Sequence, residues 1–235
     1  MSEVPHHPVA WSGARRIIRS LYPPIDLFED IADPEDWLLI LSAEQKTNPR
    51  LLDQVGRLDL VPEGRRVSGP GSSYLMAPFT HASRDRPSRF SDGSFGVLYA
   101  GDRFEVALAE TIHHHERFMR ATEESPGWTS QFRELVLDIA GTFADLRETP
   151  EQYAAELAPD EYAAARKLGY SLKEGGSDGL VYPSVRYPEG NCAALFYPDL
   201  ARPPSQGRHL DYHWDGAVVD LVRDNDMKQV FRVAR

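Results

Sequence analysis

The sequence has little cysteine and no long apolar run. Cys192 is the single cysteine among 235 residues, so no internal disulfide can form. The opening stretch, MSEVPHHPVAWSG, lacks the basic region and the apolar segment of a secretory signal peptide. No window of the sequence is long and apolar enough to cross a bilayer. We therefore expect a soluble, cytoplasmic protein with no membrane partner.

Basic residues are also in deficit. The chain carries 26 Lys and Arg against 36 Asp and Glu, which gives a formal net charge of -10. A surface of that sign repels nucleic acid, so we expect no direct nucleic-acid binding. Hydrophobic residues make up 41% of the chain and aromatic residues 10%, which argues against global disorder. A chain of 235 residues is long enough for one domain with a sizeable core.

Several common catalytic motifs are missing. The sequence contains no G-x-G-x-x-G after a strand, no G-x-x-x-x-G-K-[ST] and no H-E-x-x-H. Dinucleotide-fold redox chemistry, P-loop chemistry and zincin chemistry therefore have no support. The consecutive histidines His113 to His115 fall on a predicted helix, where neighbours point about 100° apart and cannot face one ion. We expect no metal.

The chain is organised around residues 89–110, which read RFSDGSFGVLYAGDRFEVALAE. The apolar run FGVLY predicts a short buried strand, and Gly101 is expected to break it. Asp102, with Glu105 three residues later, predicts a capping box at the start of a helix. This stretch therefore predicts a turn, a strand and a capped helix in close succession.

Three polar side chains of this stretch are expected to meet. On the predicted helix Glu110 lies at the edge of the apolar stripe, so its carboxylate is directed beside the core rather than into bulk water. Arg89 begins the turn and Tyr99 ends the strand. We expect Arg89, Tyr99 and Glu110 to converge on one cleft.

The rest of the chain mixes strands and helices without a regular βαβ rhythm, which favours an α+β fold with mixed sheets and packed helices. Residues 1–14 are expected to form a loose arm, because they contain two prolines and little apolar periodicity. Helices are predicted over about 34–47, over a short segment after residue 49, and over 149–173 with a break near Pro159. Strands are predicted over 15–22, 73–77, 131–140, 179–183, 192–198, 217–223 and 229–235.

Three further polar residues are candidates for ligand binding. Arg16 lies in the first predicted strand beside Ile17, where a guanidinium must face solvent or pair with an anion. Together with Arg89 it would suit a pyrophosphate, which the planar guanidinium fork binds in bidentate fashion. His81 is predicted to lie in the polar loop before Arg89. It could contact a ligand there, or it could be a loop histidine without function. Ser184 follows a buried strand. It could be a serine of an ordinary turn, or it could donate a hydrogen bond to a phosphate or ribose.

The order of short motifs resembles the RES-domain toxins, a family named for its Arg, Glu and Ser. The motifs are RIIRS, an Arg-aromatic turn RF, EVALAE, GLVYPSVR and GNCAALF, and the resemblance covers roughly residues 15–220. The segments YPPIDLFE and TNPR resemble the longer branch of that family, which includes a toxin that ADP-ribosylates phosphoribosyl pyrophosphate synthetase. The resemblance implies one domain over residues 15–235, with an inserted helical segment at about 34–56.

The resemblance also implies a fold, a substrate and a partner. The fold would be similar to that of the diphtheria-toxin-type ADP-ribosyltransferases, and NAD would be the substrate. The partner would be a cognate antitoxin that occludes the active site and carries a helix-turn-helix DNA-binding domain. The expected activity is transfer of ADP-ribose to a cellular acceptor protein, with phosphoribosyl pyrophosphate synthetase as a candidate.

By position, the family's site residues fall on Arg16, Arg89, Tyr99, Glu110 and Ser184, with Arg19 as a competitor for Arg16. Glu110, Arg16 and Ser184 would form the catalytic set, and His81 would join the NAD-binding residues. Two alternatives remain open. The chain could instead be an NAD glycohydrolase or NAD phosphorylase that depletes cellular NAD, or a non-catalytic nucleotide-binding module.

Overall fold

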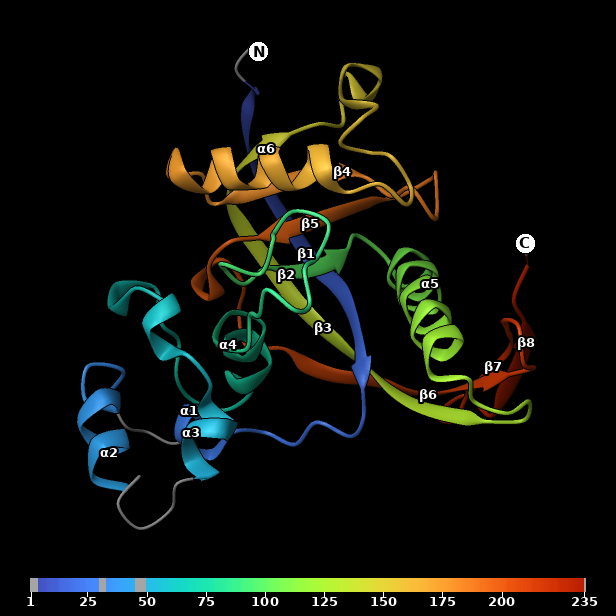
Figure 1. Ribbon diagram of the computed structural model, residues 1–235, viewed down its shortest axis with the longest axis horizontal. Coiled ribbons are helices and arrows are strands. Elements are labelled where there is room, and N and C mark those ends of the chain that lie inside the picture. The colour runs from blue at the N-terminus through green and yellow to red at the C-terminus, as the bar shows by residue number, and fades with distance from the viewer. Residues whose placement is uncertain (1–3, 30–32, 45–49, 235) are drawn as a thin grey trace.

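A mixed sheet of eight strands runs through the computed structural model, which describes residues 4–29, 33–44 and 50–234 (Figure 1). The strand order is β1-β2-β5-β4-β3-β6-β7-β8, and β1 also pairs with β3. This additional pairing closes β1, β2, β5, β4 and β3 into a ring, from which β6, β7 and β8 extend. The β3 and β4 strands are parallel, and the other neighbours are antiparallel. The expected α+β class with a mixed sheet is confirmed.

The strands are β1 (His6–Arg19), β2 (Leu98–Gly101), β3 (Thr129–Asp145), β4 (Gly179–Pro183), β5 (Asn191–Leu195), β6 (Ser205–Trp214), β7 (Val219–Asp224) and β8 (Gln229–Arg232). The helices are α1 (Asp26–Glu29), α2 (Trp37–Glu44), α3 (Arg50–Val55), α4 (Ser73–Thr80), α5 (Phe104–Thr122) and α6 (Ala163–Glu174). Short 3-10 turns cover Leu58–Leu60, Glu63–Arg65, Pro150–Tyr153 and Pro198–Leu200. Within the described residues, no helix is long and apolar enough to span a membrane.

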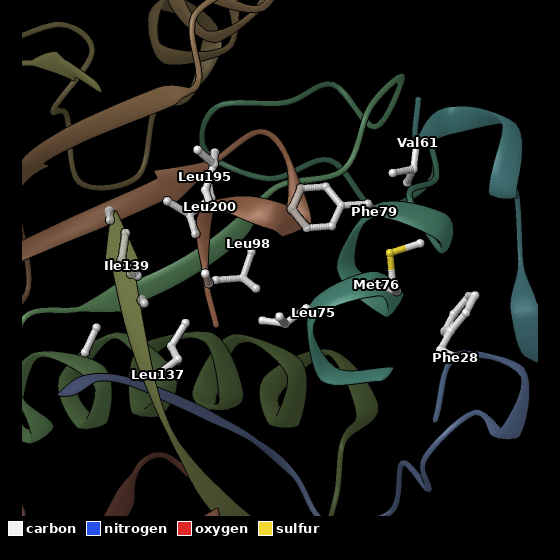
Figure 2. Close-up of a cluster of buried hydrophobic side chains, with 14 of the residues drawn as sticks. Phe28, Val61, Leu75, Met76, Phe79, Leu98, Leu137, Ile139, Leu195 and Leu200 are labelled. Carbon is white, nitrogen blue, oxygen red and sulfur yellow. The ribbon is translucent and has the colours of Figure 1, made fainter. Parts of the chain in front are cut away.

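Helices cover the sheet in three places, and each covering buries its own apolar cluster. The helices before residue 81 pack on the ring of strands, and Figure 2 shows Met76, Phe79, Leu98 and Leu195 in the cluster between them. The α6 helix covers β4 and β5 through a second cluster that includes Leu168. The α5 helix covers the extended part of the sheet. Its cluster contains Ile17, Ile112, Met119, Phe132, Tyr212 and Trp214.

Two strands diverge next to α5. The β1 and β2 strands are joined at a single register position, Arg15 opposite Gly101, whereas β1 pairs with β3 along most of its length. Two strands that share so little pairing leave room for side chains between them. The candidate site lies at this divergence.

The expected loose arm over residues 1–14 is wrong where the structure describes it. Residues 6–11 already belong to β1 and pair with 139–144 of β3. A segment with weak apolar periodicity is ordered here because a neighbouring strand completes its backbone hydrogen bonds. Residues 1–3 lie outside the described residues.

One local prediction in the middle of the chain, the strand over residues 73–77, is also wrong. The segment Ser73–Thr80 is the helix α4 rather than a strand, and Pro78 lies inside it. Leu75, Met76 and Phe79 share its buried face, which is a helical spacing. The burial of that face outweighs the strand-like appearance of the sequence.

The predicted capping box at the start of α5 does not form. Arg103 is the N-cap residue, and no side chain caps it. The Asp102 carboxylate instead accepts hydrogen bonds from the backbone and side-chain nitrogens of Asn191, both at 3.0 Å. Asp102 therefore ties the end of β2 to the start of β5. Gly101, the expected strand breaker, is the last residue of β2.

Candidate functional site

A cavity of about 330 Å³ opens where β1 and β2 diverge. Its volume lies at the lower end of the range for small-ligand sites, roughly 300–1,000 Å³. The walls come from two strands, one helix and the loop before β2. The lining residues are Arg15, Arg16, Ile17, Pro87, Ser88, Arg89, Tyr99, Ala100, Gly101, Ala107, Glu110, Thr111, His114, Tyr182 and Cys192.

Glu110 is the carboxylate in this wall. It projects from α5, and its Oε1 accepts a hydrogen bond from Ser184 Oγ at 2.8 Å. The thiol of Cys192 lies 3.8 Å from the same oxygen and is a weaker donor. Among the described residues, both of these bonds use Oε1, which leaves Oε2 available to a ligand.

Ser184 is 3% exposed and lies just after β4. Its Oγ accepts hydrogen bonds from the backbone nitrogens of Arg186, at 3.2 Å, and Tyr187, at 3.0 Å. The hydroxyl has one proton to donate, and Glu110 accepts it. Ser184 therefore fixes the carboxylate from behind and is not among the residues that line the cavity.

Arg16 lines the cavity, and Arg19 does not. The Arg16 Nη1 donates to the backbone oxygen of Tyr99 at 2.8 Å, a bond that joins β1 to the edge of β2. Burial lowers the pKa of Arg16 to about 10, so the guanidinium stays charged at neutral pH. Arg19 lies over the ring of Phe118 at 5.5 Å. Of the two candidates, the structure places Arg16 at the cavity.

Tyr99 lines the cavity, and its hydroxyl is held by the loop before β2. That hydroxyl lies 2.8 Å from Ser88 Oγ and accepts a hydrogen bond from the Phe90 backbone nitrogen at 3.0 Å. Burial raises the pKa of Tyr99 to about 12. The phenol is therefore neutral and well fixed, which suits a stacking surface better than a proton donor.

Arg89 also lines the cavity, but its donors are largely used. Nη1 donates to the backbone oxygens of Ala158, at 2.8 Å, and Glu156, at 3.4 Å, while Nη2 donates to that of Pro159 at 3.2 Å. The guanidinium also stacks over the ring of Tyr162, 4.4 Å from its centroid. Arg89 therefore holds the segment before α6, and it contributes positive charge to the cavity more than free hydrogen-bond donors.

His81 lies away from the cavity. It is the C-cap residue of α4 and is exposed. Its ring nitrogens contact Thr80 Oγ1 at 3.1 Å and the backbone oxygen of Asp53 at 3.4 Å. The expected role of His81 as an NAD-binding residue is therefore not supported by its position, because the end of α4 places it beside α3.

Sequence reasoning missed several lining residues. Tyr182 and Cys192 project from β4 and β5, and burial raises the pKa of both well above the usual range. Both residues belong to strands that the sequence predicts. Because successive side chains of a strand point to opposite faces of the sheet, the positions of Tyr182 and Cys192 along these strands could have indicated which face they share. Arg15 lines the cavity beside Arg16, because the divergence of β1 and β2 opens the space between the strands. Its Nε pairs with Glu134 Oε1 at 3.0 Å.

The arrangement suits an anionic ligand with an electron-deficient centre. Three arginines, Arg15, Arg16 and Arg89, and one carboxylate, Glu110, lie in the wall of one small cavity. Arginines bind phosphate oxygens, whereas a fixed carboxylate stabilises developing positive charge. Among the described residues, no group of three His, Cys, Asp or Glu side chains is arranged to hold a metal ion.

Comparison with known proteins assigns the chain to a family. The RES domain matches residues 64–215, more than half of the chain, so the chain belongs to the RES-domain family. The matched region contains five of the six expected site residues, Arg89, Tyr99, Glu110, Ser184 and His81, and Arg16 lies before it.

Two individual proteins are similar to this chain. An uncharacterized protein of Sinorhizobium fredii (strain NBRC 101917 / NGR234), y4oC, is 29% identical over 210 residues, which cover 88% of this chain and 85% of that protein. The crystal structure of the M. tuberculosis MbcT–MbcA toxin–antitoxin complex contains a chain that superposes with a TM-score of 0.39 at 12% identity. This superposition covers 54% of the present chain and 72% of the other.

Proposed function

We propose that the protein is an NAD-consuming toxin of a toxin–antitoxin system that transfers ADP-ribose from NAD to a cellular protein. The observation that carries this proposal is the fixed Glu110 carboxylate in a cavity that also presents Arg16 and Tyr99. Membership of the RES-domain family supports it, because the resemblance between these motifs and the RES-domain toxins implies NAD as the substrate.

The proposed chemistry follows from charge. Breaking the bond between nicotinamide and ribose builds positive charge on the anomeric carbon, as in glycoside hydrolysis. A carboxylate beside that carbon stabilises the transition state more than the ground state. We assign this role to Glu110, which Ser184 keeps in place, and the free Oε2 is the atom that would face the ribose.

The other cavity residues would bind the dinucleotide. Arg16 has charge and remaining donors for the pyrophosphate, and Arg89 adds positive charge nearby. The neutral Tyr99 ring would stack on the nicotinamide. Ser184 would act through Glu110 rather than by touching the ribose itself.

The acceptor and the partner are proposed on the resemblance alone. The acceptor would be a cellular protein, with phosphoribosyl pyrophosphate synthetase as the first candidate to test. A cognate antitoxin, with a helix-turn-helix DNA-binding domain, would neutralise the toxin in the cytoplasm by covering the cavity. If water or inorganic phosphate is the acceptor instead, the same site would deplete NAD.

The test is Glu110→Gln, compared with Glu105→Gln as a matched control. Glu105 is an exposed carboxylate on the first turn of the same helix, outside the cavity lining. We expect Glu110→Gln to fold normally but to release nicotinamide from NAD about a hundredfold more slowly, because it loses the charge that opposes the oxocarbenium ion. Growth inhibition on expression should disappear in the same variant and persist in Glu105→Gln.

Radiolabel in the adenylate part of NAD distinguishes the activities. Label that moves to protein in a cell lysate supports ADP-ribosyl transfer. Label that stays in small molecules while nicotinamide is released supports the NAD-depleting alternative. If the wild-type protein releases no nicotinamide at all, the chain is a binding module and both enzymatic proposals are wrong.

A further inference from the structure

Arg186 connects two parts of the molecule beside Glu110. Its side chain is 17% exposed, and Nη2 donates to the backbone oxygen of Pro159 at 2.5 Å and to Asp160 Oδ1 at 2.9 Å. The same nitrogen lies 3.0 Å from Nε2 of His113. Burial and the nearby Arg186 charge lower the pKa of His113, so its neutral ring can accept this hydrogen bond. One guanidinium therefore joins α5 to the segment before α6.

The backbone of the same residue acts on Ser184. Arg186 N and Tyr187 N both donate to Ser184 Oγ, and Ser184 N donates to the backbone oxygen of Gly190 at 2.9 Å. These bonds define a tight turn over residues 184–190. With its acceptor positions occupied, the hydroxyl directs its proton to Glu110 Oε1. The position of the turn therefore sets the geometry of the hydrogen bond from Ser184 Oγ to the Glu110 carboxylate.

Two contacts link that turn to the helix that carries Glu110. Ser184 reaches Glu110 itself, and Arg186 reaches His113, one turn further along α5. The link extends to the cavity wall, because Pro159 also accepts a hydrogen bond from Arg89. The Arg186 side chain thus holds the turn and the helix at a fixed separation.

We propose that Arg186 is a positioning residue for the carboxylate, acting through Ser184. This inference rests on the proposed function of Glu110. Without the guanidinium, the turn over residues 184–190 loses its bonds to His113 and Pro159 and keeps only the Ser184 contact to α5, so that contact alone must hold Ser184 Oγ in line with Glu110. Arg186 does not line the cavity, and its loss removes no ligand contact.

The test measures nicotinamide release from NAD by Arg186→Gln, Arg186→Lys and the matched control Arg117→Gln. Arg117 is an exposed arginine near the same segment, 6.0 Å from the Tyr162 ring, so its loss also removes one positive charge from this region. We expect Arg186→Gln to lower kcat by roughly tenfold to a hundredfold, the cost of a misplaced catalytic group, with KM nearly unchanged. Arg186→Lys should recover part of the rate, and Arg117→Gln should behave as wild type.

A double variant decides whether the effect passes through Ser184. In a Ser184→Ala background, Arg186→Gln should cause little further loss, because the hydroxyl on which it acts is gone. Equal losses in both backgrounds would overturn the inference, as would an Arg186→Gln rate equal to that of Arg117→Gln. If Arg186→Gln does not fold, Arg186→Lys carries the same double-variant comparison, and equal losses from it with and without the Ser184 hydroxyl overturn the inference. A wild-type protein without nicotinamide release would instead reject the proposed function.

Discussion

Arg89 illustrates how a structure changes the expected role of a single residue. Its position before a buried strand predicted a guanidinium aimed at an anion, and it does line the cavity. However, it is 7% exposed, and its terminal nitrogens bond three backbone oxygens over residues 156–159. The sequence could not predict this, because those oxygens lie about 70 residues further along the chain and come near only in the folded protein.

Removing Arg89 should therefore affect stability first. Arg89→Ala removes the donor to the Glu156 and Ala158 oxygens, one of the two donors to the Pro159 oxygen, and the arginine nearest to the Tyr162 ring. We expect a loss of about 2–3 kcal/mol in the free energy of unfolding, since the partly exposed segment can regain some hydrogen bonds from water. Urea unfolding measures this loss, and Arg89→Lys is the control that keeps the charge. If Arg89→Ala unfolds like wild type but binds NAD poorly, the guanidinium is a direct ligand contact.

The elements that the sequence predicts best are those with strong local patterns. The apolar run over Gly179–Pro183 forms β4 with the predicted bounds, and the terminal pair forms the hairpin of β7 and β8. The β6 strand was missed because its segment is rich in polar residues. The alternation of buried Leu210, Tyr212 and Trp214 within it was nevertheless a readable signal.

The convergence of the site was predictable for a related reason. Arg89, Tyr99 and Glu110 lie within 22 residues of sequence, so a turn, a strand and a helix suffice to bring them together. Ser184 and Cys192 come from distant strands, and their contact with Glu110 depends on the order of β4 and β5 in the sheet. Strand order follows from tertiary packing, which a local pattern does not encode.

Helix α6 packs closely against the loop before β2, and Gly169 is the residue at this contact. A Cβ atom on Gly169 would lie 2.0 Å from the backbone oxygen of Phe90, so Gly169→Ala must push the helix and the loop apart. Phe90 N donates to the Tyr99 hydroxyl, so the displacement should also reach the cavity. We expect a net loss of roughly 1–3 kcal/mol in the free energy of unfolding, although alanine favours a helix over glycine.

Urea unfolding and nicotinamide release together test this prediction. Gly64→Ala is the matched control, because nothing lies within 4 Å of its added Cβ and its backbone is not left-handed. A Gly169→Ala protein as stable as wild type would mean that α6 can move away from Phe90 at little cost. The helix would then not be what fixes the loop before β2.

At the scale of the whole molecule, the segment at about 34–56 belongs to the packing of the fold. Trp37 and Val55 are fully buried in the cluster that also contains Leu98 of β2 and Leu137 of β3. We propose that residues 15–235 form one domain together with residues 6–14 of β1, and that this segment is an insertion within it. Residues 45–49 of the segment lie outside the described residues.

The stability of the whole fold should depend on pH through His115. This histidine is 5% exposed on α5, its ring lies 5.0 Å from that of Phe132, and its Nε2 has no hydrogen-bond partner in the described structure. Burial, with a smaller contribution from the charge of Arg19 and opposed by Glu116, lowers the pKa of His115 from 6.5 to about 4. The folded protein therefore keeps this ring neutral where the unfolded chain protonates it.

The sign of the effect follows from proton linkage. Between about pH 6.5 and pH 4 the unfolded chain binds more protons at this site, so the stability that is present above pH 6.5 is lost as the pH falls toward 4. His115→Phe removes the titrating group and the unpartnered nitrogen while keeping an aromatic ring against Phe132 and Tyr212. We expect its melting temperature to fall less than that of wild type between pH 7 and pH 5. The exposed His81, changed to Gln, serves as the control, and an unchanged pH slope in His115→Phe would show that other groups govern acid unfolding.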